Sequence, residues 1–122
     1  MRPESMYIRL NGLKFFAYHG VLPQENLVGA MYTVNLRLKT NYLKAAQTDD
    51  LADTINYAEV FQAVKAEMQI PSKLLEHVAY RIAKHLIDNF PTIESIDISL
   101  YKENPPMEAE CGNIGVETTY SR

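Results

Sequence analysis

The amino-acid sequence predicts an α+β fold in which a four-stranded antiparallel sheet carries two antiparallel helices on one face. Two stretches of alternating apolar residues come first, two stretches with helical spacing follow, and two alternating stretches come last. This ββααββ order lacks the strand–helix–strand alternation that is typical of a parallel sheet. The 122 residues suit one domain, 1–122, because no linker-like composition or charge block divides them.

The first half of the chain predicts two long strands joined by a loop. Residues 6–18, "MYIRLNGLKFFAY", are rich in aromatic and β-branched residues, and Asn11-Gly12 indicates a bulge or bend. Residues 31–40, "MYTVNLRLKT", alternate regularly, so one strand face is expected in the core and the other in water. Long strands in a small domain favour assembly, and we expect the sheets of neighbouring copies to join into an oligomeric barrel without free edges.

The middle of the chain predicts two helices. Asn56, followed three residues later by Glu59, resembles a capping box, so the first helix is expected to begin near Asn56. Ser72 opens a second stretch, "SKLLEHVAYRIAKHLIDNF", whose apolar residues recur every three to four positions. This strongly amphipathic second helix is expected to end near Phe90-Pro91.

The last third of the chain predicts two more strands. Residues 95–102, "SIDISLYK", and residues 114–120, "IGVETTY", both alternate between apolar and polar side chains. Asn104-Pro105-Pro106 should end the third strand, because proline cannot donate to a sheet ladder. We expect these prolines to turn the chain away at the rim of a pocket.

Lys102 is unusual because it continues the apolar face of the third strand. Ile96, Ile98 and Leu100 lie two residues apart, so their side chains point the same way, and Lys102 is next in that series. One interpretation is an edge-strand lysine that discourages aggregation, with its stem on apolar surface. The other is a functional lysine, either a proton carrier or an amine nucleophile. The residues alone leave both interpretations open.

Glu76 lies inside the apolar arc of the second helix, which runs from Leu74 through Leu75 to Ile87. A carboxylate in the first turn of a helix is stabilised by the helix dipole, which explains the residue without any function. Alternatively, Glu76 accepts two parallel N–H bonds from an amidine- or guanidine-like ligand edge, since such bidentate bonding fixes orientation. Purines and pterins both carry an edge of this kind.

Tyr57 and Glu25 are further candidates, each with an ordinary structural explanation. Tyr57 follows the predicted helix cap and is either a packed aromatic residue or a side chain that stacks on, or exchanges protons with, an aromatic ligand. Glu25 lies in the loop "HGVLPQENLVG", where acids are commonly solvated but where functional residues also concentrate.

Composition argues against several classes of function. A net charge of −3 offers no broad basic surface for nucleic acid, and no apolar run approaches the roughly 20 residues that span a membrane. One cysteine, Cys111, cannot form an internal disulfide and is expected to be a bystander thiol, which agrees with a cytoplasmic protein. The histidines His19, His77 and His85 lack metal-binding spacing, and phosphate-binding glycine motifs are absent. No metal and no cofactor are therefore predicted.

Four stretches together closely resemble the dihydroneopterin aldolase family of folate biosynthesis. They are "GLKFFAYHGVLPQE", "DLADTINYAEVF", "SKLLEHVA" and "ISLYKENPPM", and the resemblance spans Tyr7 to Tyr120. It implies the tunnelling fold, with subunits that form barrel-like tetramers, commonly stacked as octamers, and active sites between neighbouring subunits. The implied reaction is cleavage of 7,8-dihydroneopterin into 6-hydroxymethyl-7,8-dihydropterin and glycolaldehyde, a retro-aldol step without metal or Schiff base.

The resemblance also implies roles for particular residues. Lys102 corresponds to the catalytic proton carrier of the family, and Tyr57 to a tyrosine that shuttles protons and meets the substrate from an adjacent subunit. Glu76 corresponds to the pterin anchor, with the Leu75 backbone beside it. Glu25 matches a loop acid that helps to place the substrate.

Other activities stay open beside this one. Adding the aldehyde back to its other face would give epimerisation at C2′ of dihydroneopterin, or of its triphosphate, although no basic cluster for a triphosphate is evident. A Schiff-base aldolase that uses Lys102 is a further variant. The chain could also be a non-catalytic oligomeric module that binds a pterin or purine edge through Glu76.

Overall fold

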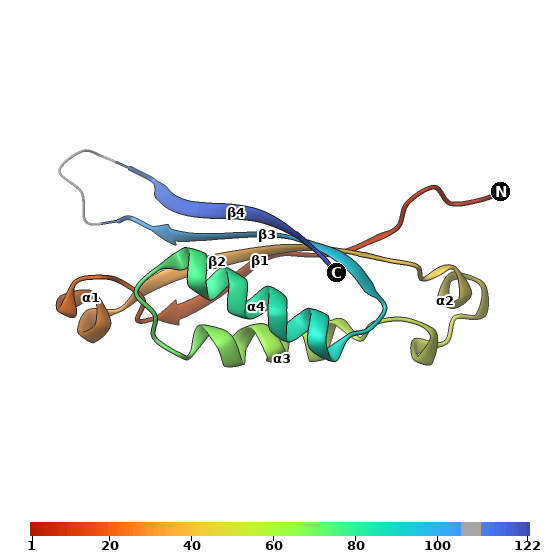
Figure 1. Ribbon diagram of the computed structural model, residues 1–122, viewed down its shortest axis with the longest axis horizontal. Helices are drawn as coiled ribbons and strands as arrows, with labels where there is room; N and C mark the ends of the chain where they lie inside the picture. Colours follow the sequence, from red (N-terminus) through yellow and green to blue (C-terminus); the bar gives the residue numbers. More distant parts are fainter. Residues whose placement is uncertain (106–110) are drawn as a thin grey trace.

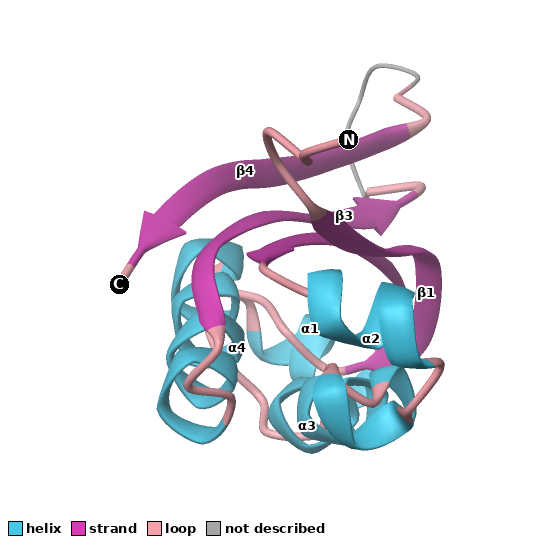
Figure 2. Cartoon of the chain, turned by 90° about the vertical axis from the view of Figure 1, so that its right-hand side faces the viewer, coloured by secondary structure: helices cyan, strands magenta, loops and turns pink. Residues whose placement is uncertain are grey.

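The computed structural model, which describes residues 1–105 and 111–122, confirms the predicted α+β fold. The four strands form an antiparallel sheet in the order of the chain: β1 (Tyr7–Ala17), β2 (Ala30–Thr40), β3 (Ile93–Glu103) and β4 (Asn113–Ser121). The two main helices, α3 (Tyr57–Met68) and α4 (Leu75–Asn89), lie on the same side of this sheet (Figures 1 and 2). The predicted ββααββ order is therefore correct for the main elements.

Three short elements were not predicted. The first two strands are joined by the helix α1 (Pro23–Val28), and β2 is followed by the helix α2 (Leu43–Thr48) and a 3₁₀ turn (Leu51–Asp53). Each of these helices has six residues or fewer, too few for a period of 3.6 to be visible in the sequence. In Figure 1, α1 and α2 lie at opposite ends of the domain.

The core lies between the sheet and the two main helices. The alternation predicted for the second and third strands is confirmed, because one face of each strand is buried. The buried side chains include Tyr32, Val34, Leu36 and Leu38 of β2, Ile96, Ile98 and Leu100 of β3, and Val60, Val64, Val78, Ile82 and Leu86 of the helices. Leu74 was wrongly included in the apolar arc, since it precedes α4 and is 50% exposed.

Local signals in the sequence set where the elements bend and begin. The register of β1 against β2 shifts between Leu10 and Leu13, where Gly12 has a positive φ of 71°, which confirms the predicted bulge. The Asn56 side chain accepts a hydrogen bond of 2.9 Å from the Ala58 N–H, so α3 begins directly after its predicted cap.

The third strand ends close to where the proline-rich stretch was expected to stop it. β3 ends at Glu103, and Asn104 has a positive φ of 49° that bends the chain away from the strand direction. Pro106, part of the predicted pocket rim, lies outside the described residues.

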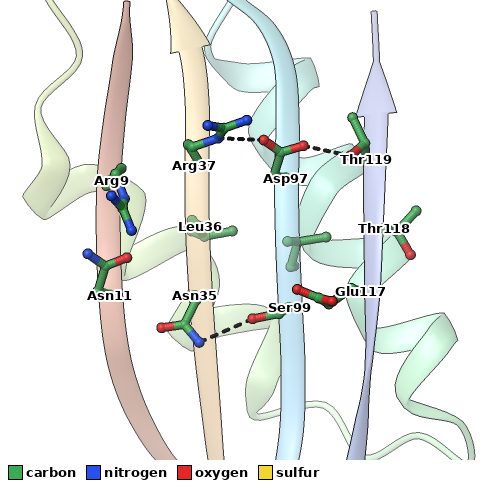
Figure 3. A pocket seen from close by; sticks show the side chains of 11 residues that line it. Arg9, Asn11, Asn35, Leu36, Arg37, Asp97, Ser99, Glu117, Thr118 and Thr119 are labelled. Carbon is green, nitrogen blue, oxygen red and sulfur yellow. Dashed lines mark hydrogen bonds and ion pairs between the residues drawn. The ribbon is translucent and has the colours of Figure 1, made fainter.

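The face of the sheet away from the helices is polar and open (Figure 3). It holds a depression of about 440 Å³, in which Arg37 donates to Asp97 at 2.7 Å and Asn35 donates to Ser99 at 3.1 Å. None of the predicted site residues lines this depression. A polar face of this kind must be covered by water or by another layer, and the expected barrel stays a prediction.

Candidate active site

Lys102 lies at the end of the core face of β3, as its spacing predicted. In the antiparallel register it is paired with Tyr32 of β2, and its ammonium nitrogen lies 6.0 Å from the centre of the Tyr32 ring. Only 12% of the Lys102 side chain is exposed. Such burial argues against the edge-protecting interpretation, which requires the ammonium group to stand in water.

Among the described residues, Glu25 is the acid that forms an ion pair with Lys102. Its Oε1 lies 3.7 Å from the Lys102 Nζ, and 21% of the Glu25 side chain is exposed. Glu25 belongs to the first turn of α1, where its Oε2 accepts a hydrogen bond of 3.4 Å from the Leu22 N–H. The structure thus brings together a loop acid and a strand lysine that are 77 positions apart in the sequence.

Gly20 makes room for the Glu25 side chain. A Cβ atom at Gly20 would collide with Oε2 and with the side-chain carbons of Glu25, and Gly20 has a φ of 155° that other residues rarely adopt. Only glycine at position 20 therefore allows the Glu25 side chain to pack against the backbone there.

Tyr32 and His19 form the layer next to Lys102. The Tyr32 hydroxyl donates a hydrogen bond of 2.7 Å to the His19 carbonyl, and the His19 ring meets the Tyr32 ring edge-on at 5.1 Å. Burial raises the pKa of Tyr32 above its ordinary value, so its hydroxyl stays protonated and can donate at neutral pH.

The His19 side chain is buried, with 1% exposure, and joins two loops. Its Nδ1 accepts a hydrogen bond of 3.1 Å from the Ser72 N–H, and the neighbouring Gly20 N–H donates to the Ser72 carbonyl at 2.9 Å. Burial, together with the positive charges of Arg81 and Lys102, lowers the pKa of His19 to about 4. The imidazole is therefore neutral at physiological pH.

Leu75 and Glu76 form the start of α4 at the same end of the domain. They follow Ser72, which is hydrogen-bonded to the loop that carries Glu25. The Glu76 side chain is exposed, and among the described residues its carboxylate has no hydrogen-bond or ion-pair partner. It is therefore available to a ligand, but the interior position suggested by the helical arc was wrong for this chain taken alone.

Tyr57 lies far from the other candidates, at the start of α3. It is 69% exposed and lines a separate depression of about 590 Å³ beside Tyr7 and Leu51. In the sheet, Tyr7 pairs with Lys39 and so belongs to the opposite end of the strands from Lys102. Within one chain, Tyr57 therefore cannot contact a ligand held at Lys102.

Sequence reasoning missed His19, Tyr32 and Ser72 as residues of this region. Tyr32 was assigned to the core face, and His19 was weighed only as a metal ligand. The sequence offered one signal for His19, because it directly precedes Gly20 in the loop "HGVLPQE", which also carries the candidate Glu25. The contact with Ser72, however, joins residues 53 apart and could not be read from spacing.

Residues 1–105 and 111–122 show neither a metal-binding cluster nor a membrane-spanning helix. Within these ranges, no group of three or more His, Cys, Asp and Glu side chains is placed to hold a metal ion. None of the helices described there has the length and apolar character needed to cross a bilayer.

Comparison with known proteins gives a consistent result. The family FolB, dihydroneopterin aldolase, matches residues 8–119. The chain is 41% identical over 111 residues to the dihydroneopterin aldolase of Staphylococcus epidermidis, which covers 90% of this chain and 92% of that protein.

Solved structures share the fold. The E. coli dihydroneopterin aldolase in complex with neopterin gives a TM-score of 0.87 at 24% identity, over 95% of this chain and 99% of that one. The dihydroneopterin aldolase of Burkholderia thailendensis bound to guanine gives a TM-score of 0.76 at 18% identity, over 98% and 93% of the two chains.

Proposed function

This chain belongs to the dihydroneopterin aldolase family, and we propose that it cleaves 7,8-dihydroneopterin into 6-hydroxymethyl-7,8-dihydropterin and glycolaldehyde. The observation that supports this most directly is the pair formed by Lys102 and Glu25, whose charged atoms lie 3.7 Å apart at the end of β3. An ammonium group and a carboxylate in a partly buried site can together hold a substrate hydroxyl group and move its proton.

The reaction needs one base and one acid. A base takes the proton of the 2′-hydroxyl group, the bond between C1′ and C2′ breaks, and its electron pair moves into the C=N bond of the pterin ring. The resulting enamine carbon is then protonated, which gives the hydroxymethyl product. Lys102 and Tyr57 are our candidates for these proton transfers, with Glu25 placing the substrate hydroxyl groups and the Lys102 ammonium.

Glu76 is our candidate for the pterin anchor. Its carboxylate stands exposed in the first turn of α4, beside the Leu75 backbone, and can accept from the 2-amino group and ring N–H of a pterin. The neopterin and guanine bound by the two structural relatives share this amino-pyrimidinone edge. The common edge supports a ligand of the pterin class for this chain.

A complete site requires a second copy of the chain. Because Tyr57 and Lys102 lie at opposite ends of the strands, we propose that Tyr57 enters the site of a neighbouring subunit. The polar open face of the sheet and the free edges of β1 and β4 are suited to a closed ring of copies, a tetramer or a stacked octamer. We expect this homo-oligomer to work in the cytoplasm.

A product assay tests the reaction. Purified protein incubated with 7,8-dihydroneopterin should release glycolaldehyde, and EDTA should leave the rate unchanged. A time course that also measures the C2′ epimer distinguishes cleavage from epimerisation and from binding without turnover. A folded oligomer that releases no glycolaldehyde would refute the proposal.

Two substitutions test the assigned roles. Lys102→Ala should reduce kcat far more than substrate affinity, because it removes a proton carrier, whereas Glu76→Ala should chiefly raise KM. If both variants change kcat and KM to the same extent, the division into carrier and anchor is wrong. Borohydride in the presence of substrate should not trap a covalent adduct on Lys102, since trapping would indicate a Schiff base.

A further inference from the structure

We propose that His19 is a positioning residue of this site, whose neutral imidazole holds the loop that carries Glu25 against the start of α4, which carries Glu76. This inference deepens the proposed function and rests on it. It assigns a role to the fully buried His19 side chain, which takes no part in the proton transfers described above.

The two loops are joined by a pair of hydrogen bonds centred on Ser72. The His19 Nδ1 accepts from the Ser72 N–H at 3.1 Å, and the Gly20 N–H donates to the Ser72 carbonyl at 2.9 Å. Glu25 follows Gly20 by five residues and Glu76 follows Ser72 by four. Short connections of this kind transmit any shift between the loops to both carboxylates, so the spacing of these acids depends on the His19 side chain.

The same residue also contacts the support of Lys102. The His19 carbonyl accepts from the Tyr32 hydroxyl at 2.7 Å, and the two rings pack edge-on. Tyr32 is the cross-strand partner of Lys102 in the sheet register. His19 thus lies where the segments that carry Glu25, Glu76 and Lys102 meet.

The protonation state required for this contact is the one that the surroundings favour. To accept from an N–H, Nδ1 must be unprotonated, and burial with the nearby charges of Arg81 and Lys102 lowers the pKa of His19 to about 4. The nearby Met68 carbonyl opposes this lowering only in part.

A histidine at this position offers an acceptor that an apolar ring lacks. A phenylalanine would fill similar space but could not accept from the Ser72 N–H. The other ring nitrogen, Nε2, is buried without a well-formed hydrogen bond among the described residues, and the nearby Met68 carbonyl favours the protonated ring. The feature that histidine supplies to the site is therefore the Nδ1 acceptor and the loop contact that it makes.

Two substitutions test the Nδ1 acceptor of His19 and the bulk of its ring separately. His19→Asn loses the ring but keeps an acceptor near the position of Nδ1, whereas His19→Phe keeps a ring of similar size and loses the acceptor. Neopterin affinity, KM and kcat for 7,8-dihydroneopterin and hydrogen exchange at the Ser72 amide are measured for both variants and the wild type. Thermal unfolding is followed in parallel, so that all binding data refer to folded protein.

We expect His19→Phe to weaken neopterin binding and raise KM by about five- to a hundredfold, with a smaller change in kcat and faster exchange at Ser72. His19→Asn should stay within about threefold of the wild type in affinity and KM. Wild-type affinity in His19→Phe, or equal losses in both variants, would overturn the proposal. A wild type that binds neopterin but releases no glycolaldehyde would instead refute the proposed function, while the affinity comparison would still decide the role of His19.

Discussion

A mixture of two inactive variants should regain activity if Tyr57 and Lys102 act in one site from different subunits. The variants are Lys102→Ala and Tyr57→Phe, each of which should lose about a hundredfold or more in turnover, the usual range for a proton carrier. In an oligomer assembled from both, some sites receive an intact Lys102 from one chain and an intact Tyr57 from its neighbour.

The strand register gives the separation between Tyr57 and Lys102 within one chain. Tyr57 lines a depression together with Tyr7. In the sheet, Tyr7 pairs with Lys39 of β2, and Lys39 pairs in turn with Ser95 of β3, so Tyr57 lies at the Ser95 end of that strand. Ser95 and Lys102 are seven residues apart, which is about 23 Å along a strand. Proton transfer requires heavy atoms within about 3 Å, so the two residues of one chain cannot serve the same substrate.

The expected recovery follows from random assembly. In an equimolar mixture, about half of the sites receive an intact Lys102, and about half of those an intact Tyr57, so about a quarter of wild-type activity should return. The variants are co-refolded, native mass spectrometry verifies mixed oligomers, and glycolaldehyde release is measured.

A matched mixture provides the control. Lys102→Ala combined with Glu25→Ala should recover nothing, because these residues lie 3.7 Å apart in the same chain and every site keeps one defect. Mixed oligomers of Lys102→Ala and Tyr57→Phe that are no more active than the separate variants would refute the shared site.

Three further predictions concern the surroundings of the site. Because the pKa of His19 is about 4 in the folded chain and about 6.5 when unfolded, its contribution to the free energy of unfolding should fall by about 3 kcal/mol as the pH drops from 7 to 4. Denaturant titrations should show this loss in the wild type and not in His19→Asn, and parallel pH curves would contradict it. Gly20→Ala should displace the Glu25 side chain and raise KM for dihydroneopterin roughly tenfold or more, and an unchanged KM would show that this close contact is dispensable. Arg81→Met should lower the free energy of unfolding by about 2–4 kcal/mol, because it removes the ion pair with the part-buried Glu67 carboxylate at 2.8 Å, which keeps only its bond to His85, and the hydrogen bonds of Arg81 to the Glu67 and Ile70 carbonyls. A loss below about 0.5 kcal/mol in chemical denaturation would refute this.

The main elements were predictable because their signals are local and repeated. The alternation in β2 and β3 has a period of two, and each strand provides several buried positions that reinforce the same assignment. The Asn56 cap and the Asn11-Gly12 bulge depend on neighbouring residues only, and both are confirmed. The six-residue helix α1 was missed because it is barely longer than one turn.

The site was predictable only in part. Spacing placed Lys102 on the core face of its strand, and the structure confirms that position. The same reasoning placed Glu76 in an apolar arc, yet its carboxylate is exposed in the single chain. Helical geometry gives the direction of a side chain relative to its own helix, but the first turn of α4 extends to the end of the domain, where no other described element covers Glu76.

By itself, the sequence determined the order and type of the main elements, the polar and apolar faces of the strands and the family to which the chain belongs. These properties follow from residues that are close in the chain and from motifs in a fixed order. Only the tertiary structure decided that Glu25 meets Lys102, that His19 binds the loop at Ser72 and that Tyr57 stands at the opposite end of the strands. Contacts between residues more than 50 positions apart depend on how the sheet and the helices pack, which no local pattern specifies.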